Sequence, residues 1–344
     1  MNAAVSRFRI PSIDIFRLVC AVMIVSIHTH PLSEISSAAG HFASEIFPRI
    51  GVPFFFAISG YFYIRALLQG KSCIRSILHT LFIYSAWSAV YFCIYVYDGL
   101  TGGESMRHIL KHILFSYFFA GSYYHFWFFP ALLFSMMLFA IAHKAKAIKL
   151  CVFISAVLYI IGCLGCAYYR VGNAIPFISD LINIKHFTEI RRVFFMGLPF
   201  FSTGYTVNYI IEKCGKTTSQ TSLKMAGLFV VLWMSEIALI ERLGIGKNLI
   251  LTLFLYPMTA FVIVALIKNP ISGAEKYAAR SRFEANFMYY SHPILIIAFR
   301  FIAKTIFKVE VGPTVLFISV VSSSIIVGGI LWKINNRLIN ALVI

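Results

Sequence analysis

The chain has 344 residues, of which 60% are hydrophobic and 12% are charged, and its mean hydropathy is +0.83. Soluble domains carry about 25% charged residues, so the composition excludes a soluble enzyme and predicts an all-α, polytopic membrane protein. The net charge of +17 is compatible with a nucleic-acid partner, but the Lys and Arg residues lie in short loops between apolar runs, where they orient helices. We therefore expect no nucleic acid, and the lipid bilayer is the expected environment.

Apolar segments near membrane-spanning length follow one another along the chain, and no linker divides them into two domains. We expect about ten transmembrane helices in a single transmembrane domain over residues 1–344, at residues 13–30, 46–68, 74–97, 125–142, 150–169, 193–211, 225–242, 247–267, 286–304 and 312–332. With the N-terminus inside, the inner loops hold more Lys and Arg than the outer loops. This bias predicts cytoplasmic N- and C-termini.

Two of the predicted outer segments are long, at residues 98–124 and 170–192. The first contains MRHILKHILFSYFF, an amphipathic stretch typical of a helix lying on a membrane surface. The second is polar and ends in Arg191 and Arg192. Outer loops that keep cations against the usual bias favour an anionic ligand, so both arginines are candidate substrate-binding residues. Each segment is either a lid over a site or a plain connection.

The first apolar segment carries three ionisable side chains, Asp14, Arg17 and His28. Arg17 and His28 are separated by about three turns of helix, a rise of about 17 Å, so they share one face that spans about half a bilayer core. Asp14 lies three residues before Arg17 and joins this face. Ionisable groups inside a membrane are costly and favour a functional site. The alternative is that Arg17 pairs with Asp14 at the membrane edge while His28 lies at the opposite interface.

Imidazole is the side chain best suited to act as a general base near neutral pH. We predict this catalytic role for His28, whereas His30 precedes Pro31 and is expected at the helix exit. No metal site is expected here, because two histidines with so few carboxylates nearby do not complete one. Cys163 and Cys166 have CxxC spacing without a second pair, which is typical of small buried residues.

Other candidate substrate-binding residues lie further along the chain. Glu236 is in the middle of an apolar run, where an unpaired carboxylate favours a role as a proton carrier or as the ligand of an ammonium or hydroxyl group. Lys71 and Arg75 would lie just inside the membrane, where they either bind a phosphate group or anchor the helices. His125 and Trp127 begin a helix from the outer side, as an interfacial aromatic belt or as part of the site.

The order of the motifs resembles the acyltransferase 3 family of membrane proteins. Arg17 and His28 with ten residues between them are followed by FFFAISGYF, HFWFFPALL, GLPFFSTGY and YYSHPIL over nearly the whole chain. The last motif is expected to open a helix, with His292 near its start. Within the family, IDIFRLVCAVMIVSIH, VPFFFAISGY, YYHFWFFPALL and Glu236 are most similar to the membrane domain of the membrane-bound serine racemases of vancomycin resistance.

This resemblance implies O-acyl transfer from a cytoplasmic acyl-CoA, or a similar donor, to a hydroxyl group on an acceptor at the outer side of a bacterial plasma membrane. His28 would be the general base and Arg17 the cation on the donor side. Acyl-CoA would be a co-substrate, and no bound cofactor is expected. One motif departs from the family, because Arg75 is followed three residues later by Leu78 instead of a second arginine.

The racemase-like subgroup implies a different function, the supply of L-serine to a cytosolic pyridoxal-phosphate domain. A fused or associated racemase domain would follow Ile344 in a longer chain. In that function Arg17 or Arg191 would bind the substrate carboxylate, and Glu236 or Asp14 would bind its ammonium group. The sequence thus leaves open an acyltransferase, an amino-acid transport module and a membrane scaffold with a degenerate site.

Overall fold

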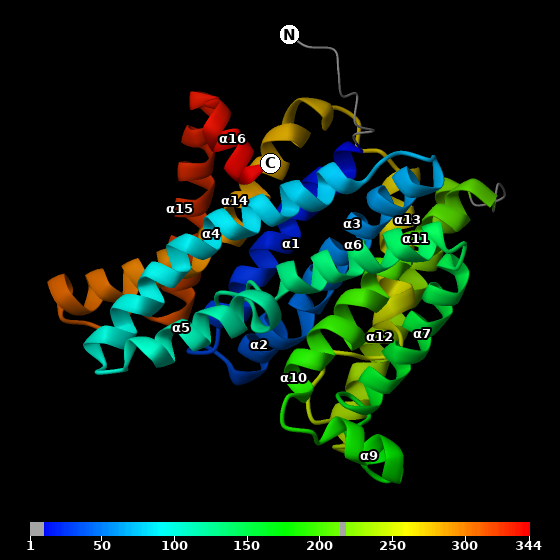
Figure 1. The fold of residues 1–344 in the computed structure, drawn as a ribbon, viewed down its shortest axis with the longest axis horizontal. Helices are drawn as coiled ribbons and strands as arrows, with labels where there is room; N and C mark the ends of the chain where they lie inside the picture. The colour runs from blue at the N-terminus through cyan, green and yellow to red at the C-terminus, as the bar shows by residue number, and fades with distance from the viewer. Residues whose placement is uncertain (1–9, 214–217) are drawn as a thin grey trace. The chain divides into compact units, whose positions relative to one another are not determined.

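The computed structural model describes residues 10–213 and 218–344, and every regular element within these residues is helical (Figure 1). The α-helices are α1 (Pro11–Thr29), α2 (Ser37–His41), α3 (Gly51–Leu68), α4 (Ile74–Thr101), α5 (Met106–Phe115), α6 (Phe128–Lys144), α7 (Ile148–Leu164), α8 (Tyr169–Asn173), α9 (Pro176–Ile182), α10 (Phe187–Ile190), α11 (Leu198–Lys213), α12 (Ser219–Leu243), α13 (Leu255–Lys268), α14 (Glu275–Ile302), α15 (Pro313–Ile334) and α16 (Arg337–Val343). Tighter or wider helical turns join several of them, namely η1 (Phe42–Ile46), η2 (Phe47–Ile50), η3 (Ser116–Ala120), η4 (Arg191–Gly197) and η5 (Ala303–Phe307).

Among the described residues, six helical stretches are long and apolar enough to cross a membrane. They are Pro11–Thr29, Ser37–Leu68, Ile74–Thr101, Ser219–Leu243, Glu275–Phe307 and Pro313–Ile334. The shorter helices α6, α7 and α13 are also apolar. The expected all-α, multi-pass membrane architecture is therefore confirmed, and each predicted apolar segment contains a helix.

The described residues form two compact units. The first unit comprises residues 10–55, 218–223 and 262–344, and the second unit comprises residues 56–213 and 224–261. Helices α3, α12 and α13 therefore contribute residues to both units.

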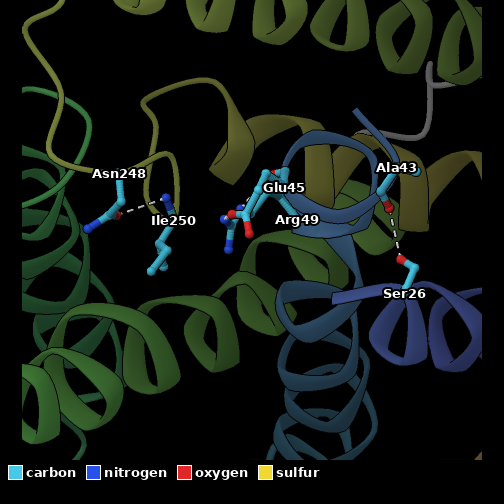
Figure 2. A network of polar contacts seen from close by, with 6 residues as sticks. All are labelled: Ser26, Ala43, Glu45, Arg49, Asn248 and Ile250. Carbon is cyan, nitrogen blue, oxygen red and sulfur yellow. Dashed lines mark hydrogen bonds and ion pairs between the residues drawn. The ribbon is translucent and has the colours of Figure 1, made fainter. Parts of the chain in front are cut away.

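In the first unit, α1 packs against α14 and α15, which also pack against each other. Small buried side chains, Ala21 of α1 and Ala285 of α14, let the helices approach closely, as is common between membrane helices. Near the C-terminal end of α1, the Ser26 hydroxyl donates a hydrogen bond of 2.9 Å to the Ala43 carbonyl of η1 (Figure 2). A few residues further along the chain, Glu45 of η1 and Arg49 of η2 form an ion pair that joins these two turns.

In the second unit, α6, α7, α11 and η4 pack around one another. Helices α3 and α11 cross where Gly60 meets Gly204, since a Cβ atom at Gly60 would collide with the Phe201 carbonyl. One turn further along α11, the Asn208 amide donates to the Tyr61 carbonyl at 3.0 Å. The close approach therefore requires both glycines.

Two predicted helices begin furthest from their expected starts. The segment 247–267 is helical only from Leu255, because residues 245–254 form an irregular connection in which Asn248 binds the Ile250 N–H at 3.1 Å (Figure 2). The segment predicted at 286–304 belongs to α14, which already begins at Glu275, so His292 lies well inside the helix and not near its start. The expectation for His292 was wrong because Pro293 reads as a helix-start signal, but membrane helices tolerate an internal proline.

Candidate functional site

The first unit holds Asp14 and Arg17 on the buried side of α1. Their side chains are only 7% and 16% exposed, and 3.9 Å separates Asp14 Oδ1 from Arg17 Nε. This is the long limit of an ion pair, so Asp14 holds the guanidinium loosely. The Nε atom of Arg17 is buried and has no hydrogen-bond acceptor among the described residues. A buried guanidinium with donor capacity remaining can bind an oxyanion.

Arg17 faces α14 across the helix contact. Tyr290 of α14 and Cys20 of α1 both lie within electrostatic range of its guanidinium. The buried Tyr290 thus extends the polar surface of α1 onto the neighbouring helix. The sequence predicted the face of α1 correctly, but it gave no indication of which helix this face would meet.

His28 meets α14 as well, about three turns further along α1. Its ring stacks on the ring of His292, with 5.3 Å between the centroids and 17° between the planes. His292 is fully buried, and its Nδ1 lies 2.9 Å from the Tyr289 carbonyl oxygen and 3.1 Å from that of Met288. The structure therefore adds His292 to the predicted residues of this site. The signal for it in the sequence is an isolated histidine before a proline in an apolar run.

The loop after His28 is tied to the start of α15. Backbone φ is 51° at His30 and 67° at Leu32, both in the left-handed region that few side chains favour. The Leu32 N–H donates to Thr314 Oγ1 at 2.8 Å, and the Thr314 N–H donates to Glu34 Oε1 at 2.9 Å. Hydrogen bonds from its own backbone and from Thr314 lower the pKa of the exposed Glu34 carboxyl. These contacts hold the end of α1, and with it His28, against α15.

The second unit holds Glu236 on α12, where its side chain is 6% exposed. The Tyr168 hydroxyl donates to Oε1 at 2.7 Å, the Leu253 N–H also donates to Oε1, and the Phe254 N–H donates to Oε2 at 2.8 Å. The carboxylate therefore accepts three hydrogen bonds and is not the unpaired acid that the sequence suggested. A carboxylate has about four acceptor positions, so Glu236 can accept one further hydrogen bond from an ammonium or hydroxyl group.

Arg191 and Arg192 lie in η4, a π-helical turn, and such turns occur frequently at functional sites. Arg191 Nη1 lies 3.8 Å from the Cys166 sulfur, and the buried Nε of Arg191 has no acceptor within the described part of the chain. Because Cys166 precedes Tyr168 by two residues, Arg191 and Glu236 contact the same short turn from different elements. Arg191 and Glu236 thus each contact a side chain of the short segment 166–168 in the second unit.

The other predicted residues have different surroundings. The Arg192 guanidinium lies 5.5 Å from the centre of the Trp127 ring, which is a cation–π arrangement. His125 is buried beside Tyr91 and Phe126, with ring centroids 5.2 and 4.1 Å away.

Lys71 and Arg75 lie at the junction of α3 and α4. Both side chains are exposed. Their position leaves them accessible to a large anionic ligand.

Comparison with known proteins gives a family assignment. The profile of the acyltransferase 3 family, described as an acyltransferase domain, matches residues 10–333. An amino-acid racemase of Enterococcus faecalis is 25% identical over 338 residues, which are 96% of this chain and 47% of that protein. A serine/alanine racemase of Enterococcus gallinarum is 27% identical over 267 residues, 74% of this chain and 36% of that protein.

A second amino-acid racemase of Enterococcus faecalis is 28% identical over 240 residues, 69% of this chain and 33% of that protein. The chain thus spans about half, or less, of the length of these relatives. No solved structure matches the chain.

Proposed function

The chain belongs to the acyltransferase 3 family, and from this premise we propose that it transfers an acyl group from a cytoplasmic thioester to a hydroxyl acceptor at the outer side of the membrane. His28 acts as the general base and Arg17 as the cation that binds the donor. The observation that carries this proposal is the placement of both side chains on one face of α1 against α14, with a histidine stacked on His28.

The reaction follows from the chemistry of these groups. His28 accepts the proton of the acceptor hydroxyl while the hydroxyl oxygen attacks the thioester carbonyl carbon. The new C–O bond forms, the C–S bond breaks, and the thiol leaves with a proton. Arg17 binds an oxygen of the donor through its buried Nε–H, and Asp14 orients the guanidinium. In the second unit, the exposed cations Lys71 and Arg75 are our candidates for binding a phosphate group.

This function needs a chain that spans the membrane from a cytoplasmic donor to an outer acceptor. We propose about ten spans, cytoplasmic N- and C-termini and a bacterial plasma membrane, with residues 1–344 acting as one transmembrane domain. A helix in each predicted segment supports this topology, as does the excess of Lys and Arg in the inner loops. The family match over residues 10–333 includes parts of both compact units and supports a single domain.

A second function is favoured by different observations. The matched relatives are named as amino-acid racemases, and in the second unit Arg191 contacts Cys166 while Glu236 contacts Tyr168, two residues further along the chain. A zwitterionic amino acid needs a cation for its carboxylate and an acid for its ammonium group, and these two side chains provide both. The alternative function is therefore the binding and uptake of L-serine for a fused or associated cytosolic racemase domain. Arg17 with Asp14 is the corresponding pair in the first unit.

One set of measurements separates the two functions. The purified chain is assayed for thioester consumption with a panel of hydroxyl acceptors, and the same preparation in liposomes is assayed for uptake of labelled serine. Thioester turnover that is lost in His28→Ala supports acyl transfer. Turnover that survives this substitution unchanged refutes the role of His28. Serine uptake above empty vesicles, without thioester turnover, supports the transport function instead.

A further inference from the structure

Helix α14 interrupts its own hydrogen-bond pattern next to His28. Pro293 lies inside the helix and has no backbone N–H, so the Tyr289 carbonyl four residues earlier lacks its usual α-helical donor. The His292 side chain replaces that donor, since its Nδ1 lies 2.9 Å from the Tyr289 oxygen and 3.1 Å from the Met288 oxygen. The proline and the histidine before it therefore act together.

These contacts determine which nitrogen of His292 carries the proton. A carbonyl oxygen can only accept a hydrogen bond, so Nδ1 must carry a proton and donate it. In the neutral ring the lone pair is then on Nε2. His292 is fully buried and its ring stacks on that of His28. A positive charge on one ring would therefore repel a positive charge on the other. The stacked pair therefore holds at most one added proton, and His28, the less buried ring, is the one that accepts it.

We propose that His292 is a positioning residue for His28: a neutral imidazole, locked as the Nδ1–H tautomer by the proline break of α14, whose ring face orients the general base and stabilises its imidazolium form. The inference rests on the proposed function of His28. During acyl transfer the proton moves from the acceptor hydroxyl to His28 as the C–O bond forms, and it leaves with the thiol as the C–S bond breaks. His292 neither gains nor loses a proton. It contributes the attraction between a cation and a neutral aromatic face.

Three substitutions separate the ring of His292 from its hydrogen bonds. His292→Asn keeps a donor near the position of Nδ1 but removes the ring. His292→Phe keeps a ring face but removes the donor. Pro293→Ala restores a backbone N–H at residue 293 that can donate to the Tyr289 carbonyl. His292 stays in place, but this carbonyl no longer needs its Nδ1–H, so the tautomer is no longer enforced.

The inference predicts that the Asn variant loses about tenfold in kcat, the scale of a desolvated cation–aromatic contact, with KM unchanged. The Phe variant should keep more of the wild-type kcat than the Asn variant. A purely structural role in capping the Tyr289 carbonyl predicts the reverse order, and that order would overturn the inference. Monodisperse elution and an unchanged helical circular dichroism spectrum identify the variants that fold.

The wild-type protein provides a test that needs no variant to fold. In the full chain with ¹⁵N-labelled histidine, His292 should show a protonated Nδ1 and an unprotonated Nε2 at neutral pH. The Pro293→Ala variant should shift this pattern towards a mixture of tautomers. A wild-type His292 that carries its proton on Nε2 would refute the tautomer lock, and so would one that is fully charged at neutral pH.

Failure of the inference can be distinguished from failure of the proposed function. Turnover that persists in His28→Ala refutes the proposed function and requires no change at His292. A fully active His292→Asn variant of an enzyme that does depend on His28 refutes the inference alone.

Discussion

Glu236 in the second unit and Arg17 in the first unit are buried charged residues with opposite surroundings. In the second unit, the Glu236 carboxylate accepts hydrogen bonds from the Tyr168 hydroxyl and from the backbone N–H groups of Leu253 and Phe254. In the first unit, Arg17 has its counter-ion Asp14 at 3.9 Å and keeps a buried Nε without an acceptor among the described residues. Donors of the protein itself occupy most of the acceptor positions of Glu236. The buried Nε–H of Arg17 can still donate a hydrogen bond to a ligand.

This difference distinguishes a structural charge from a functional one. A buried charge is costly unless hydrogen bonds or a partner compensate it. Glu236 receives that compensation from the irregular connection before α13, whose N–H groups would otherwise lack acceptors. Arg17 receives less from the protein, because its buried Nε has no acceptor among the described residues, which favours a role in binding. Substitutions in α1 should therefore affect activity more than stability, and substitutions of Glu236 should do the reverse.

The largest expected effect is on activity in the first unit. His28→Ala removes the proposed base and should lower thioester turnover by about 10²–10⁴-fold, the usual contribution of general base catalysis. The unfolding temperature should change little, because the side chain is only partly buried. Turnover and thermal unfolding are measured on the same detergent preparation. His30→Ala is the matched control and should retain near wild-type turnover, because His30 is exposed at the helix end.

The next largest effect should be on stability in the second unit. Glu236→Ala leaves the N–H groups of Leu253 and Phe254 without their acceptor and should cost about 2–6 kcal/mol, since each of the two unsatisfied groups costs about 1–3 kcal/mol. Tyr168→Phe removes one hydrogen bond from the same carboxylate and should cost about 1 kcal/mol. Denaturant or thermal unfolding of both variants tests this order. Equal stability of Glu236→Ala and the wild type would contradict a structural use of the acid.

The sequence allowed prediction of features that depend on local spacing, and the structure adds those that depend on distant contacts. The shared face of Arg17 and His28 follows from helical periodicity alone. The donors to Glu236 come from Tyr168 and from a connection that hydropathy had placed inside a helix. No local pattern reveals that a carboxylate on α12 will bind the start of α13, because the pairing is set by packing.

The case of His292 shows the same limit. A proline after histidine suggested a helix start, whereas α14 continues through Pro293 and the histidine supplies the missing donor. The sequence contained the signal, but its meaning depended on the length of the helix before it.

The transport function gives Glu236 a second role that a milder substitution can test. Glu236→Gln keeps the shape and removes the charge, and it should weaken serine binding by about 1.5–3 kcal/mol if the remaining acceptor position holds the substrate ammonium. Binding is measured by calorimetry at a temperature where the variant remains folded. Under the acyl-transfer function with a neutral alcohol, turnover should fall much less than in His28→Ala. Unchanged serine binding would remove Glu236 from the substrate site and leave Asp14 as the next acid to test.

Arg17→Lys should have a smaller effect in the first unit. Lysine keeps the positive charge but loses the planar set of donors, including the buried Nε–H. We expect KM for the thioester donor to rise about tenfold, the equivalent of one charge-assisted hydrogen bond, while the unfolding temperature stays near that of the wild type. A large loss of stability with unchanged KM would show that Arg17 is structural, and the contrast between the two units would fail.

The smallest effect on stability is expected at Glu34, an acid in the first unit that is hydrogen-bonded but exposed to solvent. Its hydrogen bonds with its own backbone and with Thr314 resemble those of Glu236, yet its side chain is exposed. Since water can replace a lost partner at an exposed site, Glu34→Gln should destabilise the protein less than any substitution at Glu236. We therefore expect burial of the carboxylate, and not the number of its hydrogen bonds, to determine how much stability each substitution removes.

The pH dependence of this variant has a definite sign. The pKa of Glu34 is lowered in the folded protein, so its contribution to stability is present above the ordinary carboxyl value of about 4.3 and is lost as the pH falls through the lowered value. The small difference in unfolding temperature between the wild type and Glu34→Gln should therefore be constant near neutral pH and vanish in acid. A difference that grows on acidification would mean that the carboxyl is bound more strongly in its protonated form, and that the contact between the end of α1 and α15 does not depend on the charge of Glu34.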